Sequence, residues 1–70
     1  MKLGARNLLK SKVIKVTPGA VNAEITLELE GGMQVVSIIT NASATNLKLS
    51  PGKDAYAMIK ASSIMAATDN

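Results

Sequence analysis

The sequence predicts an all-β fold, and three features of the chain support that prediction. Residues 23–30 alternate between apolar and polar side chains, which is typical of a strand with one buried and one solvated face. Turn-forming Pro-Gly or Gly-Gly pairs separate the apolar runs at residues 18–19, 31–32 and 51–52. The chain has 70 residues, so it has room for one domain with a single core.

The first predicted strand covers residues 13–17 and can begin as early as Asn7. Residues 17–20 read Thr-Pro-Gly-Ala, and Pro at the second position with Gly at the third suits a type II turn. The second strand is the alternating segment 23–30. Its apolar side, which we expect to face the core, consists of Ala23, Ile25, Leu27 and Leu29.

Gly31 and Gly32 suit a tight two-residue hairpin, because glycine tolerates positive φ. The third predicted strand, residues 33–40, is apolar on both faces. Such a strand places one face on its own core and the other against something else. We then expect Asn41 to cap a short helical turn that extends through Asn46.

Residues 50–53 read Ser-Pro-Gly-Lys and predict a second type II turn. A fourth strand is expected over residues 54–60 and a last extended piece over residues 62–66. About five short strands, with one small helix between the third and fourth, suit a Greek-key barrel of the OB type. A simple antiparallel sandwich is the alternative.

The composition points to an oligomer with an aliphatic core. A domain of this size buries roughly 60 % of the surface that its unfolded chain exposes, so its core is marginal. The absence of Cys and His excludes disulfides and the ordinary zinc ligand sets. Oligomerisation remains, and a hydrophobic content of 47 % predicts that apolar surface faces other subunits. Tyr56 is the only aromatic residue.

Several classes of function are disfavoured. Without His or Cys, and with five acidic residues that form no evident pair, the chain lacks the groups of an acid–base or nucleophilic enzyme. Single-stranded nucleic acids stack on aromatic side chains, which are almost absent. No segment approaches the roughly 20 apolar residues of a membrane span, and no signal peptide is evident. We therefore expect a cytoplasmic protein that is not an enzyme and binds neither nucleic acid nor membrane.

Positive charge and hydrogen-bond donors favour an anionic ligand. The first 20 residues hold five basic side chains and no acid, although a solvated lysine-bearing face would look the same. Three segments combine donors with small residues, namely 4–7, 39–43 and 59–63. Arg6, Thr40 with Ser43, and Lys60 are their main donors. A surface arginine, a helix cap and a lysine at a strand end are the ordinary alternatives.

Four blocks of the sequence form a recognisable set, namely Ala5-Arg6-Asn7, residues 19–24, Ile39-Thr40 with Ser43, and residues 59–63. Together they resemble the molbindins, or Mop proteins, which are small binders of molybdate and tungstate. The blocks lie in the family's order at the family's spacing. The resemblance implies a single molbindin domain over residues 2–67, followed by a loose tail at residues 68–70.

The resemblance implies a specific function, assembly and site. It implies an OB-like barrel that forms hexamers, described as trimers of dimers, and that holds molybdate or tungstate between subunits for storage or homeostasis. The main oxyanion site would use Ala5, Arg6, Thr40, Ser43, Lys60, Ala61 and Ser62. A second site would use Ala20, Val21 and Asn22.

Three residues depart from the family pattern. Gly4 stands where Ser is common, Ser11 where Gly is usual, and Lys48 replaces the glycine of a Leu-Gly-Leu run. These departures bear on affinity and on local backbone geometry. Two functions from other classes stay open, namely a nucleic-acid-binding OB module and an oligomerisation module without a ligand.

Overall fold

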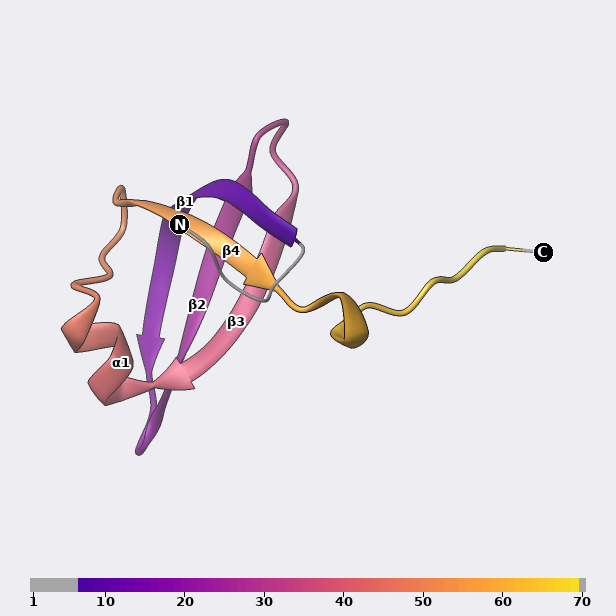
Figure 1. Cartoon of the computed structure of the whole chain (residues 1–70). Helices are drawn as coiled ribbons and strands as arrows, with labels where there is room; N and C mark the ends of the chain where they lie inside the picture. Colours follow the sequence, from indigo (N-terminus) through magenta and orange to yellow (C-terminus); the bar gives the residue numbers. More distant parts are fainter. Residues whose placement is uncertain (1–6, 70) are drawn as a thin grey trace.

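The structure is a computed structural model that describes residues 7–69. Figure 1 shows a strongly curved sheet with one short helix at its side and a C-terminal segment that runs away from it. The elements are β1 (Asn7–Pro18), β2 (Asn22–Leu29), β3 (Gln34–Thr40), α1 (Asn41–Asn46), β4 (Asp54–Ile59) and the 3₁₀ turn η1 (Ala61–Ser63).

The four strands form one antiparallel sheet in the order β3-β2-β1-β4. Three strands follow each other as hairpins, and the fourth returns through α1 to lie beside the first, which is the Greek-key arrangement. The sheet curls into a half-barrel (Figure 1). The predicted class, an OB-like Greek-key barrel with one helix, is confirmed.

Alternation along β2 builds the core, as the sequence predicts. Ala23, Ile25 and Leu27 are buried, while Glu24 on the opposite face is exposed. The buried set is entirely aliphatic and comprises Val13, Ala23, Ile25, Leu27, Ala44 and Ala57. Tyr56 lies outside it with half of its surface exposed. The predicted aliphatic core is therefore confirmed.

A bulge in β1 reverses the face that points inward. Val13 pairs with Leu27 and Lys15 with the next residue of β2, so Ile14 is an extra residue in the ladder. Before the bulge, odd-numbered residues such as Ser11 and Val13 are less exposed than their neighbours. After the bulge, the even-numbered Val16 is the less exposed residue. The sequence gives no sign of this bulge. It lets the long strand bend where it passes from β4 to β2.

Two of the predicted turns differ from expectation. The β2–β3 hairpin lies at Gly31-Gly32, both with positive φ, but its loop covers residues 30–33 and is longer than two residues. The type II turn predicted at residues 17–20 is wrong, because Pro18 still pairs with Ala23 and Gly19 has no positive φ. Gly19 is needed for space instead: a Cβ there would lie 2.8 Å from the Asn22 carbonyl oxygen.

The second predicted type II turn is confirmed. Gly52 has φ 92° at the third position, and the Lys53 N–H donates to the Ser50 carbonyl at 3.1 Å. The last predicted extended piece, residues 62–66, is wrong at its start, because Ala61–Ser63 form a 3₁₀ turn. No strand follows in the described residues, and the segment after the turn leaves the barrel (Figure 1).

Helix α1 begins and ends differently from the prediction. Its N-cap is Thr40 rather than Asn41, since the Thr40 hydroxyl accepts from the Ser43 N–H. At its C-terminus, Leu49 N–H donates to Ala44 O and Lys48 N–H to Thr45 O, which is a Schellman motif. Lys48 occupies the left-handed position with φ 55°, where the family glycine would fit without strain.

Within residues 7–69, no helix is long and apolar enough to cross a membrane.

Candidate functional site

Thr40 and Ser43 form a hydroxyl pair at the start of α1. The Thr40 Oγ1 accepts from the Ser43 N–H at 3.0 Å and donates to the Ser43 Oγ at 2.8 Å. Both residues are exposed. Because Thr40 directs its proton at Ser43, the Ser43 hydroxyl proton is the one left to donate outward. The pair therefore caps the helix and still presents a donor to solvent.

The β1–β2 turn lies against the start of the same helix. Asn41 donates twice to this turn: its backbone N–H to the Val21 carbonyl at 2.8 Å and its Nδ2 to the Gly19 carbonyl at 2.9 Å. Asn22 pairs with Thr40 across β2 and β3. The three candidates of the second site, Ala20, Val21 and Asn22, are thus adjacent to the hydroxyl pair.

The third candidate segment follows β4. Lys60 caps the 3₁₀ turn, in which Ser63 N–H donates to the Lys60 carbonyl at 2.9 Å. Within the described chain, the N–H groups of Ala61 and Ser62 and the Ser62 hydroxyl donate to no recorded acceptor. All of these residues are exposed. The segment offers a cation, two amides and a hydroxyl to an external acceptor.

Two expected site residues, Ala5 and Arg6, lie outside the described residues, as does Gly4. The structure does describe the first pair of residues beyond them. Asn7 pairs with Ile59 across β1 and β4, and the Asn7 Nδ2 donates to the Ile59 carbonyl at 3.2 Å. Arg6 and Lys60 are the sequence neighbours of this pair.

The sheet keeps the two described groups of candidates apart within one chain. Lys60 follows the pair that joins Ile59 to Asn7, the first residue of β1. Thr40 pairs with Asn22, beyond the last residue of β1. The two groups therefore adjoin opposite ends of a 12-residue strand.

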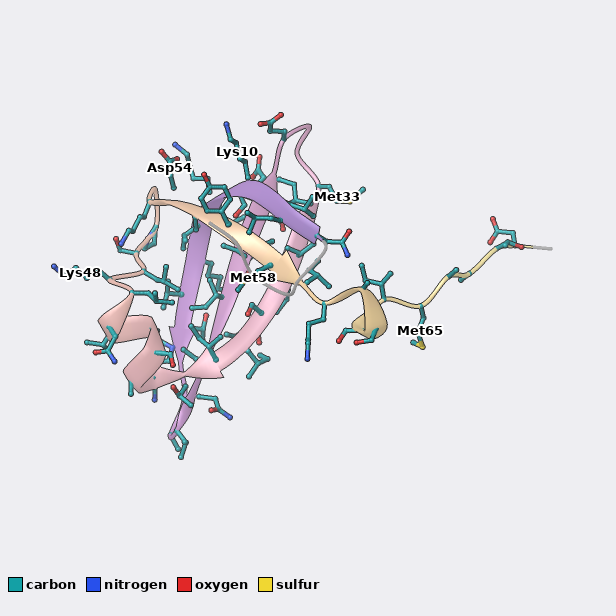
Figure 2. All side chains as sticks on the ribbon, viewed as in Figure 1. Lys10, Met33, Lys48, Asp54, Met58 and Met65 are labelled. Carbon is teal, nitrogen blue, oxygen red and sulfur yellow. The ribbon has the colours of Figure 1, made fainter. Side chains whose placement is uncertain are left out.

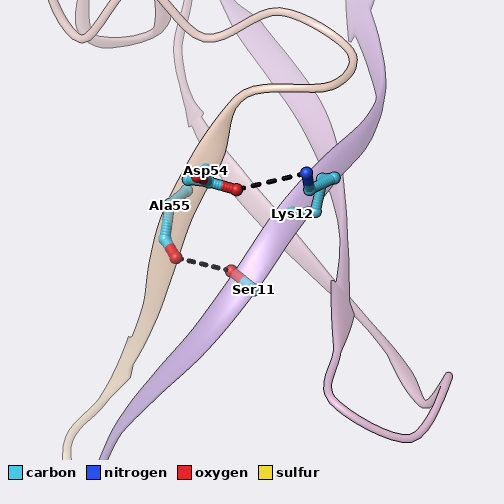
Figure 3. Close-up of polar contacts among 4 residues, drawn as sticks. All are labelled: Ser11, Lys12, Asp54 and Ala55. Carbon is cyan, nitrogen blue, oxygen red and sulfur yellow. Dashed lines mark hydrogen bonds and ion pairs between the residues drawn. The ribbon is translucent and has the colours of Figure 1, made fainter.

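Carboxylates collect in another part of the molecule. Glu28, Glu30 and Asp54 line an open groove of about 610 Å³ together with Lys10 and Lys12. Figure 3 shows its rim, where Lys12 Nζ lies 3.3 Å from Asp54 Oδ1.

Beside this ion pair, the Ser11 hydroxyl donates to the Ala55 carbonyl at 3.2 Å and thereby ties β1 to β4 (Figure 3). Ser11 thus makes a cross-strand bond at a position where the family usually has Gly.

The candidate segments supply donors and no carboxylate. Across residues 7–69, no group of three or more His, Cys, Asp or Glu side chains could hold a metal cation. A set of hydroxyls, amides and a lysine instead suits an anion that carries only acceptors. Sequence reasoning missed Asn41 as the link between two of these segments, because the partner carbonyls are 20 and 22 residues away in the chain.

A model of the TOBE domain matches residues 4–66. The chain belongs to the TOBE domain family. The probable molybdenum-pterin-binding protein of Haemophilus influenzae is 42 % identical over 69 residues, which are 99 % of this chain and 100 % of that protein. MopA of Rhodobacter capsulatus is 46 % identical over 67 residues, which are 96 % of this chain but 25 % of MopA. This TOBE chain therefore spans about a quarter of MopA, and its expected kinship with Mop proteins is confirmed.

Solved structures of related proteins share the fold. MopII from Clostridium pasteurianum superposes with a TM-score of 0.90 at 36 % identity, over 96 % of this chain and 100 % of that one. A molybdate-binding protein from Sporomusa ovata gives a TM-score of 0.92 at 32 % identity, over 97 % and 100 %. The cytoplasmic molybdate-binding protein ModG, in a molybdate-bound form, superposes with a TM-score of 0.84 at 46 % identity, over 87 % of this TOBE chain and 43 % of the ModG chain.

Proposed function

We propose that this protein binds molybdate or tungstate at sites shared between the subunits of a homo-oligomer, for intracellular storage or homeostasis. The observation that carries the proposal is the match, over 97 % of this chain, to a solved molybdate-binding protein with a TM-score of 0.92. The proposed domain covers residues 2–67, with residues 68–70 as a tail.

The chemistry of the candidate residues supports an oxyanion ligand. Molybdate is a tetrahedral dianion with four acceptor oxygens, so its site must offer donors and countercharge. Lys60 and Arg6 supply charge in the proposed site, and Ser43 supplies a hydroxyl proton. Charge-assisted hydrogen bonds are worth about 1.5–3 kcal/mol each, so four to six of them support micromolar binding after association costs.

The separation of the two candidate groups supports a site shared between subunits. The group around Thr40 and the group around Lys60 adjoin opposite ends of β1, so a second chain is needed to bring them to one anion. Arg6 and Ala5 would complete the main site beside Lys60. The Ala20-Val21-Asn22 turn would line the second site.

The C-terminal segment supports assembly. Ile64 and Met65 are 52 % and 93 % exposed, and the segment that carries them extends away from the half-barrel (Figures 1 and 2). Val36 and Ile38 on the outer face of β3 are also exposed. Apolar surface of this kind is typical of interfaces. The proposed assembly is a hexamer built as a trimer of dimers.

Calorimetric titration with molybdate tests the proposal. We expect micromolar or tighter binding, competition by tungstate, and a melting temperature that rises with ligand because only the folded oligomer binds it. Arg6→Ala should weaken binding more than tenfold, whereas Lys15→Ala, which removes a charge from the middle of β1, should change it less than twofold. Absence of molybdate binding, or tighter binding of sulfate or phosphate, would refute the proposed ligand.

A further inference from the structure

The Gly19–Ala20 peptide is held from one side by a single side chain. The Asn41 Nδ2 donates to the Gly19 carbonyl at 2.9 Å, although the two residues are 22 positions apart in the chain. The Asn41 amide orientation follows from this contact, because a flipped amide would place two oxygen acceptors against each other. Its Oδ1 is buried and has no hydrogen-bond partner, so one acceptor is left unpaired while the donor is used.

This contact decides where the next amide points. Gly19 C=O and Ala20 N–H belong to one peptide unit, and no peptide bond in the described chain is cis. In a planar trans peptide the two groups point in opposite directions. Since the Gly19 carbonyl faces Asn41, the Ala20 N–H faces away from α1. It donates to no recorded acceptor within residues 7–69.

The turn has little freedom to adopt another arrangement. The Gly19 N–H donates to the Asn22 carbonyl at 2.7 Å, and any side chain at Gly19 would collide with that oxygen. A second bond, from the Asn41 backbone N–H to the Val21 carbonyl at 2.8 Å, holds the other side of the turn. This backbone bond survives side-chain replacement, so substitution of Asn41 releases only the Gly19–Ala20 peptide.

We propose that Asn41 is a positioning residue of the second oxyanion site, where its side-chain amide fixes the Gly19–Ala20 peptide so that the Ala20 N–H is presented to the anion. The inference rests on the proposed function and extends it to a residue outside the expected ligand set. An ordered donor needs no rearrangement when the anion arrives, which favours binding. The carbonyl's hydrogen bond from Nδ2 also polarises the same peptide toward a stronger N–H donor.

The test uses the full chain and sodium molybdate. In the wild-type protein, the ¹⁵N-resolved amide signal of Ala20 should shift as molybdate is added. In Asn41→Ala, that shift should be markedly smaller at a molybdate concentration that half-saturates the wild-type sites. By calorimetry, the affinity of one class of sites should fall about two- to tenfold, the range expected for one neutral hydrogen bond. The other class should change less than twofold.

Two further variants separate positioning from stability. Asn41→Asp keeps the shape but replaces the donor with a negatively charged acceptor, so the loss at the same class of sites should be at least as large as in Asn41→Ala. Asn46→Ala and Asn46→Asp change an exposed asparagine at the far end of α1 and should leave both classes unchanged. A merely structural role would lower the melting temperature of the ligand-free protein without affecting one class selectively.

The outcomes distinguish this inference from the proposed function. If the wild-type protein binds no molybdate, the proposed function fails and the inference fails with it. If it binds molybdate but the Ala20 amide does not respond, or responds equally in Asn41→Ala, the inference alone is overturned. If Asn41→Ala fails to fold, Asn41→Asp supplies the comparison, and a wild-type Ala20 amide that does not respond overturns the inference without any variant.

Discussion

The two ends of β1 carry similar kinds of donor but differ in how those donors are held. At the end near α1, Thr40 and Ser43 are joined to each other, and Asn41 is joined to the β1–β2 turn, by hydrogen bonds of 2.8–3.0 Å. At the other end, the hydroxyl of Ser62 has no recorded partner within residues 7–69, and the segment that carries it extends outward. The donors at the first end are held by hydrogen bonds within their own chain, whereas in the proposed assembly those at the second end would be held by contacts with another chain.

The largest effect is expected at the second end. Replacing both Ile64 and Met65 by Asp should weaken subunit association at least about a hundredfold, because burying each such side chain stabilises an interface by about 1.5–3 kcal/mol. Sedimentation over a dilution series measures the change. Met33→Ser, at the tip of the β2–β3 hairpin (Figure 2), is the control for loss of an exposed methionine. Undiminished assembly of the double variant would show that the segment after β4 does not contribute to subunit association.

The hydroxyl pair gives the next largest effect. Thr40→Val removes the N-cap of α1 and should lower the free energy of unfolding of the ligand-free protein by about 1 kcal/mol. Ser62→Ala should leave that quantity unchanged, because its hydroxyl bonds to no other described residue. Urea titration of both variants measures the contrast. Equal destabilisation by the two substitutions would remove the distinction between the ends.

A stabilising substitution tests whether the end of β1 near α1 is held within a single chain. Lys48→Gly relieves a left-handed residue at the end of α1 and should raise the free energy of unfolding by about 0.5–1 kcal/mol. The rise is smaller than the strain released, because Gly also gains entropy in the unfolded chain, which favours unfolding. The gain should be the same at any protein concentration, because the strain lies within one chain. A destabilised glycine variant would mean that the Lys48 side chain makes a contact that outweighs its strain.

The smallest effect is expected in the charged groove between the two ends. Asp54→Asn breaks the ion pair with Lys12. The Asp54 side chain is 90 % exposed and the Lys12 side chain 58 % exposed. Exposed ion pairs contribute little to stability, so the free energy of unfolding, measured by thermal unfolding, should change by less than about 0.5 kcal/mol. A larger loss at low salt that vanishes at high salt would show that the groove charges act as a network.

Local patterns predicted the parts of the fold that local physics decides. The alternation of residues 23–30 identified β2, and Pro51-Gly52 identified the type II turn, because each depends on a short stretch of chain. The bulge at Ile14 was not predictable, since it lies in the register between β1 and β2, which neither segment shows by itself. Gly19 was assigned the wrong role because the constraint on it is the nearby Asn22 carbonyl rather than its own φ.

In the candidate site too, features set by a short stretch of chain were predictable, and features set by distant contacts were not. Thr40, Ser43 and the segment 60–62 were recognisable as donors from the sequence, and the structure describes how they are held. The link through Asn41 was not recognised, because its partners lie in a different hairpin. The positions of Ala5 and Arg6 relative to Lys60 stay predictions, because Ala5 and Arg6 lie outside the described residues.

Because β1 pairs with both β2 and β4, the order in which the chain folds is constrained. The hairpin between β1 and β2 closes over a few residues, whereas Asn7 and Ile59 are 52 positions apart. Contacts between distant residues form slowly, since the loop must close before they contribute. We therefore expect the three-stranded meander to form first and β4 to add last, so that during synthesis the open edge of β1 stays unpaired until β4 emerges.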